Sequence, residues 1–78
     1  MPFVNVKLIK GVFDADQKKD MIHQLTETMV AIEGEAMRSV TWVTIEEVES
    51  GDWGIGGNAL TTQDVKDLQA SAPAGATR

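Results

Sequence analysis

The chain has 78 residues, no cysteine, a single histidine (His23) and a formal net charge of −5 at pH 7. This composition excludes disulfides and thiolate metal sites, and seven basic residues scattered along an acidic chain argue against a nucleic-acid-binding patch. No apolar run approaches the roughly 18 residues of a membrane span, and the N-terminus lacks the blocks of a signal peptide, so we expect a cytoplasmic protein.

Residues 3–9 alternate and are rich in β-branched side chains, which predicts a strand with Val4, Val6 and Leu8 on one face. The other face mixes apolar and polar side chains, so we expect it to be only partly buried. Gly11 marks the turn that follows.

A capped helix is predicted next. Asp14, followed three residues later by Gln17, forms a capping box, so we expect the helix to begin at about Ala15, and Gly34 is the expected C-cap. One apolar stripe should run along this helix, formed by Ile22, Leu25, Met29 and Ile32.

Residues 39–48 are rich in Val, Thr, Trp and Ile and predict a second strand, with Val40, Trp42 and Thr44 on one face. The helical connection between the strands has the size of a right-handed βαβ unit, which predicts parallel strands. The expected fold is α+β, with a two-stranded parallel sheet and one long helix. Such a protomer leaves much apolar surface exposed, so we expect partner subunits to cover it.

A glycine-rich loop over residues 51–57 surrounds Trp53 and Ile55 and predicts tight turns. The exposed Trp–Ile pair is expected to pack against something outside its own segment. The run GIGGNA, residues 54–59, formally fits a dinucleotide-binding fingerprint. We interpret that match as accidental, because a nucleotide-binding fold needs a helix directly after the glycines and then a further strand with an acidic residue. The remaining chain has room only for a short helix and a tail.

The C-terminal part is expected to be short. Thr61 or Thr62 can cap a helix over residues 64–70, and the last eight residues have the composition of a disordered end. We therefore expect one domain over residues 1–62, and a short helix and flexible tail over residues 63–78.

Two candidate reactive groups have simpler interpretations. His23 has no second nitrogen ligand in the chain, so we expect a surface position for it. Glu46 and Glu47 are adjacent in a strand and point to opposite faces, and with Glu49 they suggest a solvated strand end rather than paired catalytic carboxylates.

Pro2 is the strongest candidate for chemistry. If Met1 is removed, residue 2 becomes a free secondary amine on a rigid ring. An α-amino group has a reference pKa of about 7.7 to 8.0. An apolar pocket would lower that pKa and leave a neutral base near working pH.

Four segments together resemble the 4-oxalocrotonate tautomerase (4-OT) family of the tautomerase superfamily: MPFVNVKLIKG, DADQKK, SVTWVTIEEV and GDWGIGG. The resemblance covers residues 2 to about 60. It implies a β-α-β protomer that dimerises through its sheets and assembles as a trimer of dimers, a homohexamer with active sites between subunits. It also implies a tautomerase or isomerase that interconverts enol and keto or unconjugated and conjugated forms without any metal or organic cofactor.

The resemblance makes Pro2 the general base and Trp53 the aromatic wall of the pocket, and a family serine corresponds to Ser39. The family's two carboxylate-binding arginines fall on Val12 and Thr41, and neither side chain can replace an arginine. A diacid is therefore a doubtful substrate, whereas a monoacid, a neutral enol or an aromatic pyruvate-like compound fits better.

Other side chains are expected to complete the site. Ile55 would join Trp53 in a water-poor wall, and Thr41 or Ser39 would offer a hydrogen bond. Three cations are candidates to replace the lost arginines: Arg38, Lys7 and Lys10. Two alternatives remain, a non-catalytic assembly module that kept the fold, and a monomeric binding domain.

Overall fold

The computed structural model describes residues 1–71. The chain divides into two compact units: a first unit of Met1–Leu8 and Phe13–Glu46, and a second unit of Ile9–Val12 and the residues from Glu47 onward. The predicted flexible tail beyond Ser71 lies outside the described residues.

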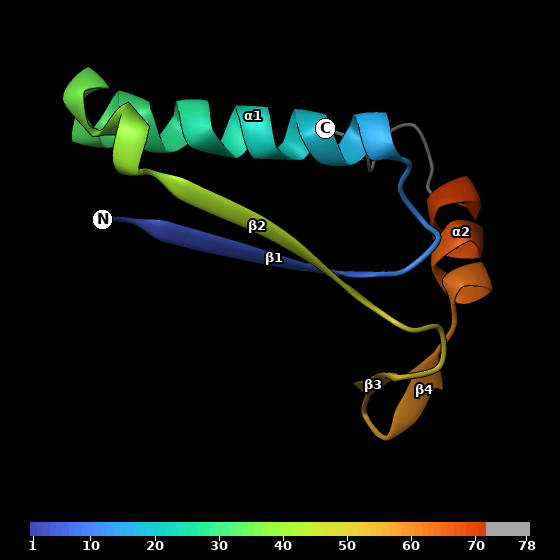
Figure 1. Ribbon diagram of the computed structural model, residues 1–78. Helices are drawn as coiled ribbons and strands as arrows, with labels where there is room; N and C mark the ends of the chain where they lie inside the picture. Colours follow the sequence, from blue (N-terminus) through green and yellow to red (C-terminus); the bar gives the residue numbers. More distant parts are fainter. Residues whose placement is uncertain (72–78) are drawn as a thin grey trace. The chain divides into compact units, whose positions relative to one another are not determined.

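The helices and strands follow one another along the chain as Figure 1 shows. In order they are β1 (Phe3–Ile9), α1 (Ala15–Glu33), the 3-10 helix η1 (Glu35–Val40), β2 (Trp42–Val48), β3 (Trp53–Ile55), β4 (Asn58–Leu60) and α2 (Thr62–Ser71). The predicted first strand and the predicted start of the long helix are confirmed.

Strands β1 and β2 form a two-stranded sheet. The Trp42 N–H donates to the Pro2 carbonyl (3.0 Å) at one end, and the Lys10 N–H donates to the Val48 carbonyl (2.8 Å) at the other. The start of one strand therefore meets the start of the other, so the strands are parallel, as predicted. In a parallel ladder these two bonds place each residue of β1 opposite the residue 39 positions later.

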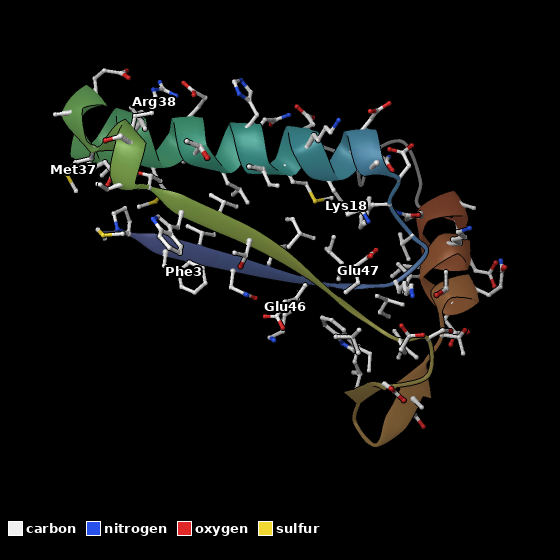
Figure 2. All side chains as sticks on the ribbon, viewed as in Figure 1. Phe3, Lys18, Met37, Arg38, Glu46 and Glu47 are labelled. Carbon is white, nitrogen blue, oxygen red and sulfur yellow. The ribbon has the colours of Figure 1, made fainter. Side chains whose placement is uncertain are left out.

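This register puts Phe3 beside Trp42, Asn5 beside Thr44, and Lys7 beside Glu46. The two aromatic rings meet edge to face, with centroids 6.5 Å apart. Figure 2 shows Phe3 and Glu46 on the side of the sheet that faces away from α1. On the other side, Val4, Val6 and Leu8 are half-buried, as the alternation in this strand predicts.

Helix α1 begins at the predicted capping box: the Asp14 carboxylate accepts from the Gln17 N–H (2.8 Å), and the Gln17 side chain accepts from the Asp14 N–H (2.9 Å). The expected apolar stripe is only partly right. Ile22 and Ile32 are 39% and 78% exposed, whereas Val30 is buried. Ile32 stands out because it lies in the last turn of α1, directly before the chain turns at Gly34 (φ +103°).

Residues 39 and 40 were expected in the second strand, and that boundary is wrong. Ser39 and Val40 lie in η1, and β2 begins only at Trp42. The physical reason is that the chain must turn back after α1, and the 3-10 turn is closed by the Thr41 N–H bonding the Arg38 carbonyl (3.3 Å).

The second unit contains a hairpin that the sequence predicted only as tight turns. Strands β3 and β4 pair antiparallel, with Trp53 opposite Leu60 and Ile55 opposite Asn58. Gly56 and Gly57 form the two-residue turn, both with positive φ (58° and 86°), a conformation that favours glycine. A strand follows these glycines, so the fingerprint-like run is part of a hairpin.

Helix α2 of the second unit is capped by Thr61, as expected. The Thr61 side chain accepts from the Asp64 N–H (3.1 Å), and Asp64 accepts from the Thr61 N–H (3.0 Å). The helix is also tied to the turn after β1, because the Thr62 hydroxyl donates to the Lys10 carbonyl.

The hydrophobic core of the described residues is small. Ile9 and Val30 are the buried hydrophobic residues. Seven large hydrophobic side chains are exposed instead: Met1, Phe3, Ile22, Ile32, Trp42, Ile55 and Leu68. Over residues 1–71, no helix has both the length and the apolar character needed to cross a membrane.

Candidate functional site

Pro2 lies directly before β1 and is half-buried. Its carbonyl accepts a hydrogen bond from the Trp42 N–H (3.0 Å). This bond holds residue 2 against the start of β2. This bond gives the residue-2 nitrogen a defined place at one end of the first unit, which a terminal residue without a partner would not have.

Ser39 and Thr41 also lie at this end of the first unit: Ser39 is in the last turn of η1, and Thr41 is the residue directly after this helix. Thr41 is half-buried, and its hydroxyl lies within hydrogen-bond distance of the Glu33 carboxylate and of the Met37 carbonyl (2.8 Å). Ser39 is exposed, and its hydroxyl has no partner among residues 1–71. Of these two hydroxyls, the Ser39 hydroxyl is the one whose donor is not used by a described residue.

Arg38 is held by two glutamates. Its guanidinium makes hydrogen bonds to both carboxylate oxygens of Glu27, one of them at 3.0 Å, and to both of Glu35, at 2.5 and 3.2 Å. These charge-assisted bonds from Arg38 hold the pKa values of the Glu27 and Glu35 carboxyl groups below their ordinary value of 4.5. The two carboxylates in turn raise the pKa of Arg38.

The two lysines considered as substitutes for arginine are paired as well. Lys7 lies 3.2 Å from Glu46, and Lys10 lies 3.3 Å from Glu49 in the second unit. Hydrogen bonds from Asn5 (2.7 Å) and Lys7 lower the pKa of Glu46. Both pairs are exposed, so each contributes little to stability.

Trp53 and Ile55 belong to the second unit. They are two residues apart in β3 and therefore share a face of the hairpin. Trp53 is half-buried, and Ile55 is 56% exposed. An isoleucine this exposed beside a tryptophan forms an apolar surface suited to an apolar ligand or partner.

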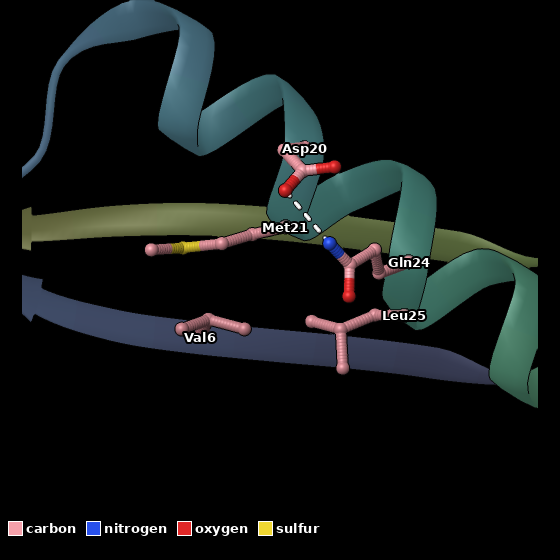
Figure 3. A pocket seen from close by; sticks show the side chains of 5 residues that line it. All are labelled: Val6, Asp20, Met21, Gln24 and Leu25. Atoms are coloured by element: carbon pink, nitrogen blue, oxygen red, sulfur yellow. Dashed lines mark hydrogen bonds between the residues drawn. The ribbon is translucent and has the colours of Figure 1, made fainter. Parts of the chain in front are cut away.

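A cavity of about 370 Å³ opens between α1 and β1 in the first unit. Figure 3 shows its apolar wall of Val6, Met21 and Leu25, with Asp20 and Gln24 joined by a hydrogen bond of 2.7 Å. It includes none of the predicted site residues, and it offers no nucleophile or paired titratable groups.

His23 is exposed on α1, as expected. Across the described part of the chain, no group of three or more His, Cys, Asp or Glu side chains is placed to hold a metal ion.

Sequence reasoning missed the acidic partners in this region, Glu27, Glu33 and Glu35. The spacing of Glu35 and Arg38, three residues apart, is a recognisable helical ion-pair signal. The spacing of Glu27 and Arg38 is not, because eleven residues separate them and only the reversal of the chain at Gly34 brings them together.

A parallel two-stranded sheet, one long connecting helix, and a proline at position 2 bonded to the start of the second strand define a β-α-β protomer of the tautomerase type. The family described as "Tautomerase enzyme" matches residues 2–63. The curated relative "Probable tautomerase K2" of Dickeya dadantii (strain 3937) is 43% identical over 61 residues, which cover 78% of this chain and 90% of the relative.

Solved structures also align with most of this chain. The crystal structure of apo unfused 4-OT aligns with a TM-score of 0.65 and 30% identity, covering 81% of this chain and 97% of that one. DmpI from Helicobacter pylori aligns with a TM-score of 0.67 and 31% identity, covering 76% and 95%. The chain belongs to the tautomerase family and to its 4-oxalocrotonate tautomerase group, a family of isomerases, and this membership supports a tautomerase-type function.

Proposed function

We propose that the chain is a cofactor-independent, cytoplasmic tautomerase in which Pro2, after removal of Met1, is the general base. The amine takes a proton from the carbon beside a carbonyl group, and the resulting enol returns the proton in the reverse direction. The substrate is a small oxo or enol compound, either a monoacid or an aromatic one.

The single observation that carries this proposal is the hydrogen bond from the Trp42 N–H to the Pro2 carbonyl (3.0 Å). A general base must be held within reach of the proton that it abstracts, and this bond fixes the backbone of residue 2 at the end of the sheet. Family membership supports the same assignment.

The other site residues have assisting roles in the proposal. Ser39 donates a hydrogen bond to the substrate oxygen, with Thr41 as the neighbouring hydroxyl. Trp53 and Ile55 supply an apolar wall in the assembled protein, which disfavours the charged form of the amine and so keeps the base neutral.

We further propose that the protein works as a homo-oligomer, a hexamer built as a trimer of dimers. The support is the burial deficit: Phe3 is 61% exposed and Trp42 is 56% exposed on the open face of the sheet, and Ile32 is 78% exposed on α1. Apolar side chains this exposed, gathered on the sheet and on α1, indicate contact surfaces.

One experiment on the purified chain tests both parts. Sedimentation equilibrium should give a mass of six protomers, and the same sample should accelerate ketonisation of an arylpyruvate enol, followed by the loss of its ultraviolet absorbance. An oligomer without turnover would favour the assembly module, and a monomer without turnover would favour the binding domain. Either result would contradict the proposed enzyme.

A further inference from the structure

Trp42 contacts Pro2 and Phe3 at two separate points. Its N–H donates to the Pro2 carbonyl (3.0 Å). Its ring meets the Phe3 ring edge to face, with centroids 6.5 Å apart and an angle of 89° between the ring planes, which is one of the favoured geometries of an aromatic pair. One contact uses the backbone and the other uses side chains, so a single residue of β2 holds both residue 2 and the residue that follows it.

The two contacts fix the peptide plane that joins Pro2 to Phe3. The bond to the Pro2 carbonyl holds one end of this plane, and the Phe3 ring, placed against Trp42, holds the other end. Proline has no free rotation about its N–Cα bond, because that bond is part of the pyrrolidine ring. A single rotation, about the Pro2 Cα–C bond, then separates the amine from the fixed plane. The contacts with Trp42 therefore limit where the amine nitrogen can lie.

The side-chain pairs on the open face of the sheet change in character away from residue 2. The pair beside residue 2 is aromatic. The next pair is polar, with the Asn5 side chain donating to the Thr44 hydroxyl (2.9 Å), and the pair after it is the ion pair of Lys7 and Glu46 (3.2 Å). Figure 2 shows Phe3 at the end of β1 where the chain begins. The aromatic contact is thus placed where it can act on residue 2.

The two rings are not part of the hydrophobic core. Phe3 is 61% exposed and Trp42 is 56% exposed, whereas the buried hydrophobic residues of the described chain are Ile9 and Val30. Loss of the ring contact should therefore leave the core intact. In the proposed oligomer a partner subunit would cover the rings and strengthen their hold on residue 2, so the assembly of every variant has to be measured.

We propose that Phe3 and Trp42 are positioning residues, whose ring contact holds the Pro2 amine in the orientation needed for proton transfer. This inference rests on the proposed function and adds two residues to it. A misplacement of about 1 Å in a catalytic group can cost about 100-fold in rate, so a partial loosening should cost less. A loosened amine would also be more exposed to water, which would raise its pKa toward the ordinary α-amino range of about 7.7 to 8.0.

A matched pair of variants at position 3 tests the inference. Phe3→Leu removes the aromatic ring but keeps a large apolar side chain, whereas Phe3→Tyr keeps the ring. We expect Phe3→Leu to lower kcat for an arylpyruvate enol about tenfold, to change KM by less than about twofold, and to move the acid limb of the kcat/KM profile to higher pH. Phe3→Tyr should keep the kcat and the pH profile of the parent.

The pH profile distinguishes positioning from a merely structural role. A variant that only unfolds more easily has fewer intact sites, and its unfolded molecules do not contribute to the profile, so the acid limb would stay in place. Leu68→Ala is the control, because it removes a side chain that is 68% exposed on α2 of the second unit. It should leave kcat and the pH profile unchanged.

A double-mutant cycle tests whether the two rings act through one contact. Trp42→Leu keeps the backbone N–H and removes the ring, so it should also lower kcat about tenfold. The double variant Phe3→Leu/Trp42→Leu should lose about tenfold and not about 100-fold, because the second change removes a contact that is already lost. Sedimentation mass is measured for each variant. If Phe3→Leu does not assemble, the comparison of Trp42→Leu with Trp42→Phe, which keeps an aromatic ring, decides the question.

The outcomes separate this inference from the proposed function. An assembled Phe3→Leu variant with the kcat and the pH profile of the parent would overturn the inference and leave the tautomerase intact. Equal losses in Phe3→Leu and Phe3→Tyr, or a loss of about 100-fold in the double variant, would overturn it too. Absence of turnover in the parent chain would overturn the proposed function, and the inference with it.

Discussion

Replacement of Pro2 by alanine is expected to lower kcat/KM for an arylpyruvate enol about 100-fold, with Met1 removed in both proteins. Positioned general bases contribute about 10²- to 10⁴-fold, and alanine keeps a terminal amine, so the loss should lie at the low end of that range. Initial rates of ketonisation, measured with the parent and the variant at several pH values, give the comparison.

The control for this variant is assembly. Pro2→Ala should keep the sedimentation mass and the circular dichroism of the parent, because the residue-2 carbonyl that accepts the Trp42 N–H is retained. Unchanged turnover in a correctly assembled variant would show that another group removes the proton.

Retention of Met1 is expected to abolish turnover, with a loss of at least about 10³-fold, because the residue-2 nitrogen then belongs to an amide and has no free lone pair for a proton. The measurement compares two preparations of one chain, with and without Met1, whose masses establish the N-terminus. A protease-cleavable extension before Pro2 provides the matched control, since its removal should restore turnover. Full activity in the chain that keeps Met1 would contradict a role for the terminal amine.

Local signals predicted much of the first unit. Alternation identified the strand that became β1, and the capping box at Asp14 and Gln17 identified the start of α1 within one residue. Both signals depend on contacts between residues close in sequence, so the chain itself carries them. The helical connection between the strands was enough to predict that they are parallel.

The region between α1 and β2 could not be predicted in the same way. Val40 and Thr41 are β-branched and favour a strand locally, yet Val40 lies in η1 because the chain reverses at Gly34. That reversal also brings Arg38 to Glu27, a contact between residues eleven apart. Tertiary structure decided both outcomes, so the pairing of Arg38 with Glu27 could not be predicted from the sequence, whereas its pairing with Glu35, three residues away, could have been.

The apolar stripe of α1 shows a second kind of limit. Helical spacing gave Ile22, Leu25, Met29 and Ile32, but burial also depends on how far the facing strands extend. Leu25 and Met29 are half-buried, whereas Ile32 remains 78% exposed in the last turn. The proposed oligomer requires apolar side chains that stay exposed in the single protomer, because a partner subunit would cover them.

The candidate site follows the same division between local and tertiary information. Pro2 could be proposed from the sequence because its chemistry depends only on being residue 2 with Met1 removed, and Trp53 because the glycine-rich loop around it is distinctive; both roles stay predictions. Ser39 and Thr41 were named from the resemblance, but which hydroxyl is available depended on the structure: Thr41 is engaged by Glu33, and Ser39 is not engaged by any described residue.

The most direct test of the central claim is a ¹⁵N NMR titration of the Pro2 nitrogen in the assembled protein, compared with the pH dependence of kcat/KM for one enol substrate. The kcat/KM profile reports the pKa of the essential base in the free enzyme. We predict that its acid limb and the NMR titration give the same pKa, because one amine produces both. A kcat/KM profile that stays flat while Pro2 titrates, or an acid limb displaced from the NMR value by a full pH unit, would contradict the claim that Pro2 is the base.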